Sequence, residues 1–222
     1  MKVNTLQKEL GNIQSSLDYF LMSNIPKDAK ILDIGCNYGS LIYNLYKLGY
    51  KNIKGVDVNK ESIKKGKTEY KEISKNISYY NGNKIPVKDE SFDVVLMFDV
   101  IEHISSIQKF LKNEVYRVLK KEGRFIFQTP NKLTNIPWEI LQSKSFTKWK
   151  KYHCSLQTYS SLKQLLKYLG FRDIKIEKYN ILTEHNKDKI RSKFGFFGGV
   201  LLNLVSLMPL RFQSNFFGSA IK

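Results

Sequence analysis

One stretch decides how the chain folds: Lys30-Ile31-Leu32-Asp33-Ile34-Gly35-Cys36-Asn37-Tyr38-Gly39. Its first half is a run of apolar residues around one aspartate, which is typical of a short buried strand. Its second half holds two glycines, which adopt the backbone conformations that a tight turn needs. Residues 41–48 then show helical spacing and stop at Gly49. The stretch therefore predicts a strand, a sharp turn and a helix.

The same alternation continues along the chain. Apolar patterns predict further strands at residues 53–58, 77–80, 92–98, 124–129, 171–179 and 216–221. Helical spacing predicts helices at residues 4–22, 41–48, 60–73, 107–119 and 158–169. Residues 131–157 show no clear period and are expected to be irregular. This order predicts an α/β fold with a doubly wound, mostly parallel seven-stranded sheet and helices on both faces, a Rossmann-like arrangement.

The length of 222 residues suits one domain. We expect five parts: an N-terminal helix (1–28), a ligand-binding core (29–131), a substrate-side half (132–189), an apolar segment (190–212) and a last strand (213–222). The two cysteines, Cys36 and Cys154, lie far apart and have no metal-binding spacing. This usage predicts a reduced, cytoplasmic protein.

The net charge of +17 raises the possibility of a nucleic-acid partner. Most of the 37 basic residues are lysines, however, and they are scattered over every segment. Arginine is the residue that base recognition and bidentate phosphate binding favour. We therefore expect solvated lysines rather than a nucleic-acid surface, although a basic surface still favours anionic lipid headgroups.

Three loops that follow predicted strands carry residues suited to a ligand. In an open parallel sheet, ligands bind at the carboxyl ends of the strands. The first loop is the turn from Asp33 to Gly39, where a helix N-terminus favours a negative group. The second loop holds Asp57, whose carboxylate can accept hydrogen bonds from the hydroxyls of a ribose. The third is Asn81-Gly82, which can contact an adenine.

The same residues also allow a nicotinamide site or a purely structural role. A nicotinamide enzyme would need the pattern G-x-G-x-x-G, and here Asn37 stands in place of the second glycine. The turn between Gly35 and Gly39 could form without any ligand, and Asp57 could cap the helix that starts near Lys60.

Several motifs in order resemble the class I S-adenosylmethionine-dependent methyltransferases, in particular the branch with quinone-biosynthesis and polysaccharide-associated O-methyltransferases. They are Ile31-Leu32-Asp33-Ile34-Gly35-Cys36-Asn37-Tyr38-Gly39, Gly55-Val56-Asp57, Ile85-Pro86, Ser91-Phe92-Asp93, Val100-Ile101-Glu102-His103-Ile104, Tyr116-Arg117-Val118-Leu119-Lys120, Glu122-Gly123 and Thr129-Pro130-Asn131. The resemblance covers residues 31–131 strongly and continues more weakly to about residue 171. It implies that the last strand is antiparallel.

The resemblance also implies roles. The cofactor would be S-adenosylmethionine, with S-adenosylhomocysteine as the product and no metal. Asn81 stands where the family usually has an aspartate near the adenine amino group. The cofactor-binding residues would be, from the methionine end to the adenine end, Asp33, Gly35, Cys36, Asn37, Gly39, Phe98, Asp57, Val58, Asn81 and Gly82.

Two histidines are candidates for moving the proton of a methyl acceptor. His103 follows Glu102 in a family motif, and it could instead orient its loop. His153 lies in the irregular stretch where related enzymes build substrate lids, and it could instead be a packed residue. There is no second acidic cluster, which disfavours a metal-dependent catechol-type enzyme.

The apolar run at residues 194–210 is flanked by Arg191, Lys193 and Arg211. It is shorter than the roughly 20 residues of a membrane span. It could pack on the domain as a substrate cap, lie on the cytoplasmic face of a membrane near a lipid-linked substrate, or span the membrane in spite of its length. We therefore expect methyl transfer to a hydroxyl of a small molecule or of a lipid- or glycan-linked acceptor. The alternatives are an RNA or protein methyltransferase and a catalytically silent cofactor-binding module.

Overall fold

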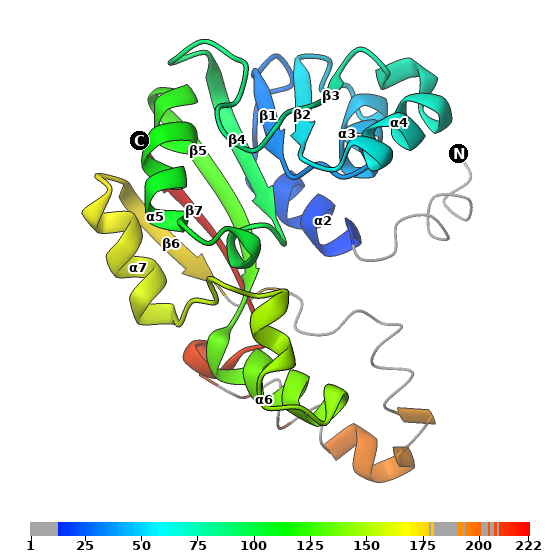
Figure 1. Cartoon of the computed structure of the whole chain (residues 1–222), viewed down its shortest axis with the longest axis vertical. Helices are drawn as coiled ribbons and strands as arrows, with labels where there is room; N and C mark the ends of the chain where they lie inside the picture. The colour runs from blue at the N-terminus through cyan, green and yellow to red at the C-terminus, as the bar shows by residue number, and fades with distance from the viewer. Residues whose placement is uncertain are drawn as a thin grey trace.

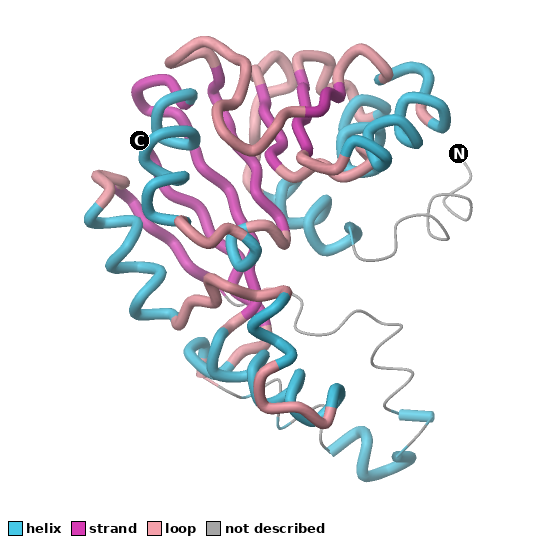
Figure 2. Tube along the Cα trace, viewed as in Figure 1, coloured by secondary structure: helices cyan, strands magenta, loops and turns pink. Residues whose placement is uncertain are grey.

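The chain is described from a computed structural model that covers residues 13–177, 179, 191–192, 194–200, 204, 207 and 209–222. A twisted sheet runs through the molecule, and Figures 1 and 2 show helices against its two faces. This confirms the predicted Rossmann-like class. The first part of the helix predicted at residues 4–22 lies outside the described residues, and so does most of the stretch at 178–190.

The seven strands lie where the sequence predicts them, except that β5 begins at Leu119, five residues before the predicted start. They are β1 (Ile31–Ile34), β2 (Ile53–Asp57), β3 (Ile77–Tyr79), β4 (Phe92–Phe98), β5 (Leu119–Pro130), β6 (Arg172–Glu177) and β7 (Asn215–Ile221). Their order in the sheet is β3-β2-β1-β4-β5-β7-β6. The first five strands pair in parallel, and β7 pairs antiparallel with both β5 and β6, as the resemblance implies.

The helices surround this sheet. The α-helices are α2 (Gln14–Met22), α3 (Ser40–Lys47), α4 (Lys60–Glu69), α5 (Ile107–Phe110), α6 (Lys132–Ser143) and α7 (Tyr159–Tyr168). Shorter helical segments are η2 (Lys71–Ile73), η3 (Ile101–His103), η4 (Leu111–Tyr116), η5 (Lys148–Lys151) and η6 (Leu210–Phe212). Residues 194–200 are also helical.

The helix α6 corrects the expectation that residues 131–157 are irregular. Its N-terminus is capped by Asn131, whose side chain accepts a hydrogen bond from the backbone of Leu133 at 3.1 Å. The helix contains Pro137 and has no fully buried residue. A proline inside the helix and the lack of a buried apolar stripe removed the periodic signal on which the prediction depended.

Two hydrophobic layers fill the space between sheet and helices. One layer joins α5, η4 and α7 to one face of the sheet, and the other joins α2, α3 and α4 to the opposite face. The strand β4 lies between β1 and β5, and its residues Val95, Leu96 and Met97 have no exposed surface. The strand order reverses between β1 and β4, so the carboxyl ends of these two strands border the place where such sheets bind ligands.

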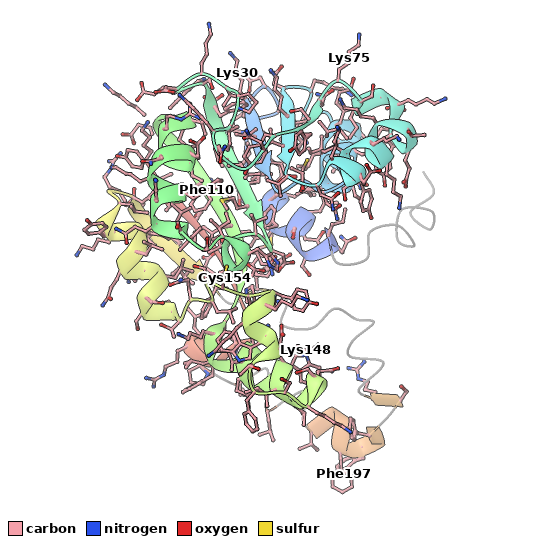
Figure 3. All side chains as sticks on the ribbon, viewed as in Figure 1. Lys30, Lys75, Phe110, Lys148, Cys154 and Phe197 are labelled. Atoms are coloured by element: carbon pink, nitrogen blue, oxygen red, sulfur yellow. The ribbon has the colours of Figure 1, made fainter. Side chains whose placement is uncertain are left out.

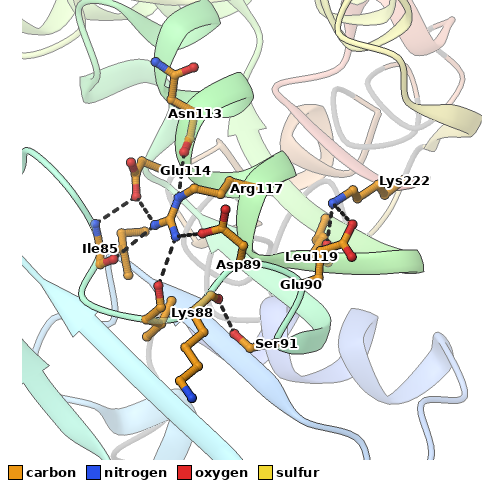
Figure 4. A network of polar contacts seen from close by, with 11 residues as sticks. Ile85, Lys88, Asp89, Glu90, Ser91, Asn113, Glu114, Arg117, Leu119 and Lys222 are labelled. Atoms are coloured by element: carbon orange, nitrogen blue, oxygen red, sulfur yellow. Dashed lines mark hydrogen bonds and ion pairs between the residues drawn. The ribbon is translucent and has the colours of Figure 1, made fainter.

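A polar network ties the loop between β3 and β4 to η4 and the turn that follows it (Figure 4). The Arg117 guanidinium donates to the Glu114 carboxylate at 2.7 Å and to the Asp89 carboxylate at 2.6 Å. It also donates to the backbone carbonyls of Ile85 and Val87 at 3.1 and 3.0 Å. Glu114 in turn accepts from the Ile85 backbone at 2.8 Å.

This network predicts the effect of Arg117→Ala on stability. The Glu114 side chain is 7% exposed, so the substitution leaves a buried carboxylate without its cation. We expect the free energy of unfolding to fall by about 3 kcal/mol, as when one partner of a buried ion pair is removed. Urea unfolding followed by circular dichroism measures this change.

Arg172→Ala is the matched control. Arg172 also pairs with a glutamate, Glu122, but the two side chains are 55% and 74% exposed. An exposed pair contributes at most about 1 kcal/mol, so the control should lose far less stability. Equal losses in the two variants would contradict the structural role of the Arg117 network.

Candidate functional site

The turn after β1 is built on two glycines in the left-handed region. Gly35 has φ +81° and Gly39 has φ +87°, conformations that favour glycine. A Cβ on Gly35 would also collide with the side chain of Val100. The Gly35 backbone N–H donates to the carbonyl of Val56 in β2 at 2.8 Å. The turn is therefore held closely against the end of the neighbouring strand.

The Asp57 carboxylate connects the turns after β1 and β2. One of its oxygens accepts from the backbone of Asn37 and the other from the backbone of Asn59, each at 2.7 Å. The helix α4 is capped by the side chain of Asn59, which accepts from the backbone of Ser62 at 3.0 Å. Helix capping by Asp57 itself is therefore not its role here.

Buried carboxylates concentrate negative charge at this sheet edge. Asp33 is 3% exposed, and burial together with the nearby charge of Asp57 raises its pKa to about 7. Burial and the charges of both aspartates also raise the pKa of the Cys36 thiol, so Cys36 stays a neutral packing residue. A group with a positive charge would relieve the repulsion between the two aspartates.

The part of the site that the sequence predicts to bind adenine is exposed and has both apolar and polar residues. Val58 is 58% exposed, and a Cβ built on Gly82 would lie 3.5 Å from its side chain, so the loops after β2 and β3 face each other. Asn81 is exposed, and its side-chain oxygen accepts from the backbone of Asn83 at 3.1 Å. The side-chain amide nitrogen of Asn81 is thereby left as the group that can donate to a ligand.

The chain leaves β4 at Phe98 through a strained residue. Phe98 is half-buried, and the next residue, Asp99, has φ +54°. The Asp99 carboxylate accepts from the side-chain amide of Gln128 at 2.7 Å. This contact ties together the carboxyl ends of β4 and β5, which lie beside the turn after β1.

A second acidic group lies just beyond β4. Glu102 is 2% exposed and accepts a hydrogen bond from the hydroxyl of Thr129 at 2.9 Å. Burial, and then the charge of Asp99, raise the pKa of Glu102 to about 7. The backbone carbonyl of Glu102 accepts from the backbone of Ser155 at 3.0 Å, which holds residues 152–155 against this loop.

The fold brings the two candidate histidines together. His103 and His153 are 50 positions apart in the sequence, yet their ring centroids are 5.1 Å apart. The Nδ1 atom of His103 lies 2.6 Å from the carbonyl of Tyr152, and the Nδ1 atom of His153 lies 2.8 Å from the carboxylate of Glu139. Since a carbonyl and a carboxylate oxygen only accept, Nδ1 is the donor in both contacts, and Nε2 is the ring nitrogen that remains for another partner.

Sequence reasoning selected both histidines and missed the groups that orient them. Glu139 and Asn135, which lies 3.2 Å from the His153 Nδ1 atom, belong to α6, a helix that the pattern did not predict. Thr129 appeared only as part of a motif. Figure 3 labels Cys154, which follows His153 in the sequence, below Phe110 and above Lys148 in the view. The cofactor roles inferred for the ten predicted residues remain predictions, although their positions at one sheet edge agree with them.

The sequence is also similar to known methyltransferases. The model of a family described as a methyltransferase domain matches residues 25–190. A protein named ubiquinone biosynthesis O-methyltransferase from Pelagibacter ubique is 34% identical over 125 residues, 55% of this chain and 51% of that protein. A probable S-adenosylmethionine-dependent methyltransferase from Mycolicibacterium smegmatis is 28% identical over 144 residues, 64% of this chain and 51% of its own length. The matched stretches span about half the length of these relatives.

Solved structures show the same fold. A methyltransferase from Archaeoglobus fulgidus has a TM-score of 0.62 and 22% identity, with both chains covered completely. A phosphoethanolamine N-methyltransferase from Haemonchus contortus, solved with S-adenosylhomocysteine, has a TM-score of 0.65 and 19% identity over 96% of this chain and 53% of that one. The match of the family model over most of the chain, joined to this fold, shows that the protein belongs to the methyltransferase-domain family of the class I S-adenosylmethionine-dependent methyltransferases.

Proposed function

We propose that this protein transfers the methyl group of S-adenosylmethionine to a hydroxyl of a small molecule or of a lipid- or glycan-linked acceptor. The observation that carries the proposal is the cluster of Glu102, His103 and His153 beyond β4, next to the predicted methionine end of the cofactor site. A hydroxyl needs help to lose its proton, and imidazoles oriented through Nδ1 supply that help. The name of the Pelagibacter ubique relative agrees with a hydroxyl acceptor.

Binding of the cofactor would use the charges already present. The sulfonium and the ammonium group of S-adenosylmethionine are positive, and bound S-adenosylmethionine supplies an electrophilic methyl group. Asp33 offers a buried carboxylate to the methionine end. Asp57 already holds the adjoining turn, so a ribose would meet a carboxylate that is fixed in place. Val58 and Gly82 would enclose the adenine from two loops.

The chain's remaining task is to align the acceptor. Methyl transfer from a sulfonium is an in-line displacement, so the acceptor oxygen must approach the methyl carbon from the side opposite the sulfur. His103 is half exposed and His153 is 16% exposed in its side chain, so both lie where an acceptor can reach them. They would bind the hydroxyl and promote the loss of its proton.

A membrane contact would fit a lipid-linked acceptor. Phe196 and Phe197 are 82% and 78% exposed, and Figure 3 shows Phe197 at the end of the molecule opposite Lys30 and Lys75. Within the described residues, no helix is long and apolar enough to cross a membrane. We propose that the apolar segment 190–212 lies instead in the interface of an anionic membrane on the cytoplasmic side, where the net charge of +17 also favours binding.

The cofactor prediction concerns Asp57→Ala. Isothermal titration with S-adenosylmethionine should show one site in the wild type. Loss of a charge-assisted contact typically costs about 1.5–3 kcal/mol, so the variant should bind about 10- to 100-fold more weakly. Asp28→Ala, at an exposed position, is the control and should bind like the wild type. No heat with the folded wild type would contradict the proposal.

The buried Asp33 leads to a prediction about pH. In the unfolded chain an aspartate titrates near about 3.9, whereas in the folded chain the pKa is about 7. As pH rises through this window, the unfolded chain releases the proton first, so the free energy of unfolding falls. Asp33→Asn should remove this loss, and its melting temperature should fall less than that of the wild type between about pH 5 and about pH 7.

The same variant should bind S-adenosylmethionine more weakly, because an amide attracts a cation less than a carboxylate does. Asp28→Asn should follow the pH profile of the wild type. An Asp33→Asn profile equal to that of the wild type would show that Asp33 does not hold its proton in the folded state.

The membrane proposal predicts the behaviour of the double variant Phe196→Ser and Phe197→Ser. Wild-type protein should co-sediment with vesicles of phosphatidylcholine and phosphatidylglycerol. Burial of one aromatic side chain contributes about 1.5–3 kcal/mol, so the double variant should bind at least about 10-fold more weakly. Tyr168→Ser, at a position on α7 that is 76% exposed, is the control for loss of an exposed aromatic ring. Vesicle binding by the double variant that equals that of the wild type would rule out this membrane contact.

A further inference from the structure

We propose that Glu102, His103 and His153 together bind one divalent transition-metal cation of the Zn²⁺ type. Each of the three side chains offers one ligand atom, and these atoms lie within 4.8 Å of one another. Two imidazoles and one carboxylate form a ligand set that first-row transition metals favour, whereas Mg²⁺ and Ca²⁺ prefer oxygen ligands. The position of this set beyond β4 places the cation beside the predicted methionine end of the cofactor site.

The spacing needs only a small adjustment. Zinc lies about 2.1 Å from nitrogen and oxygen ligands, so tetrahedral ligands are roughly 3.4 Å apart. The Nε2 atom of His103 is 3.8 Å from the nearer oxygen of Glu102, which is close to that separation. Side-chain rotations that move the atoms by about 1 Å would complete the set.

The hydrogen bonds around the histidines supply an independent argument. Metal-binding histidines usually donate the other ring N–H to a carboxylate or a backbone carbonyl, which fixes the ring and its tautomer. His153 has this arrangement with Glu139, at 2.8 Å, and His103 has it with the carbonyl of Tyr152, at 2.6 Å. Both rings are therefore oriented through Nδ1 and keep Nε2 for a ligand bond.

The carboxylate is oriented in the same way. Glu102 is 2% exposed, and one of its oxygens accepts from the hydroxyl of Thr129, which is fully buried. The Nε2 atom of His103 lies 3.8 Å from the other carboxylate oxygen. Asp99 adds a further negative charge nearby. A buried carboxylate that faces two imidazoles beside another acidic group is an environment that a cation stabilises.

The cation would deepen the proposed function, and this part of the inference rests on that function. A hydroxyl bound to the cation loses its proton to solvent water far more readily than a free hydroxyl. The oxygen then forms a bond to the methyl carbon while the bond from carbon to sulfur breaks, and the electron pair of that bond stays on sulfur. In this arrangement the histidines hold the cation and do not act as free bases.

The sequence predicted that the protein binds no metal, because it shows no second acidic cluster. The ligands found here come from two regions about 50 residues apart, and two of the three are histidines. Neither region has a metal-binding spacing by itself. The fold creates the site by bringing the loop after β4 against residues 152–155.

Direct metal binding tests the proposal. Protein without a histidine tag is freed of metal with a chelator and titrated with ZnCl₂ by calorimetry. We expect one site with a dissociation constant of about 1 µM or tighter. With CoCl₂, visible absorption bands of a low-coordinate Co²⁺ complex should appear at the same stoichiometry.

Variants of the ligand residues distinguish metal binding at this site from nonspecific metal binding elsewhere on the protein. His153→Ala and His103→Ala should each abolish the Co²⁺ bands, and Glu139→Gln should weaken binding by about 10- to 100-fold, because it removes the carboxylate that orients His153. Glu72→Gln, at a half-exposed position paired with Lys47, is the control and should bind like the wild type. Melting temperatures without metal establish that each variant is folded.

Failure of the proposal is distinguishable from failure of the proposed function. No Zn²⁺ binding by the folded wild type, or equal binding by His103→Ala and His153→Ala, would overturn the site. Undiminished methyl transfer after chelation would overturn the role of the cation and leave the proposed function standing. Methyl transfer that is lost after chelation and restored by Zn²⁺, while S-adenosylmethionine binding is unchanged, would support both the metal site and the proposed function.

Discussion

The contact on which the site depends is the double hydrogen bond of Asp57. Its two carboxylate oxygens accept from the backbones of Asn37 and Asn59, at the turns that follow β1 and β2. The glycine conformations at Gly35 and Gly39 bring the first turn close enough for this contact. The other residues predicted to bind the cofactor lie at the carboxyl ends of β1, β2, β3 and β4 or just after them, at the same edge of the sheet.

The distribution of charge follows from the same arrangement. The chain carries a net charge of +17, yet the carboxyl ends of its parallel strands bury three acidic residues, Asp33, Asp57 and Glu102. Burying carboxylates without nearby cations costs stability. The positively charged methyl donor and the divalent cation proposed above would offset the charge of these carboxylates.

Much of the fold could be predicted because its signals are local. The strand β4 begins and ends where the sequence predicts. A strand that is buried on both faces has a continuous apolar run, which can be recognised from the local sequence alone. The helix α6 could not be predicted, because Pro137 interrupts its pattern and no residue in it is buried. Such a helix is held by its cap and by tertiary contacts.

The same distinction applies to the site. Asp33, Gly35, Gly39 and Asp57 lie in short motifs next to strands, so the sequence indicated them directly. His103 and His153 lie close together because residues 152–155 pack against the loop after β4. No local sequence pattern predicts that contact. Glu139 was missed for the same reason: its role is to orient His153, and that contact exists only in the folded chain.

The central claim is methyl transfer to a hydroxyl, and one measurement tests it most directly. Purified protein, supplied with ZnCl₂ and S-adenosylmethionine carrying a radioactive methyl group, is incubated with lipid, quinone and glycan extracts and, separately, with RNA and protein. We expect label in a small-molecule or lipid-linked product that contains a methyl ether. Label confined to RNA or protein, or no transfer to any acceptor by protein that binds the cofactor, would contradict it.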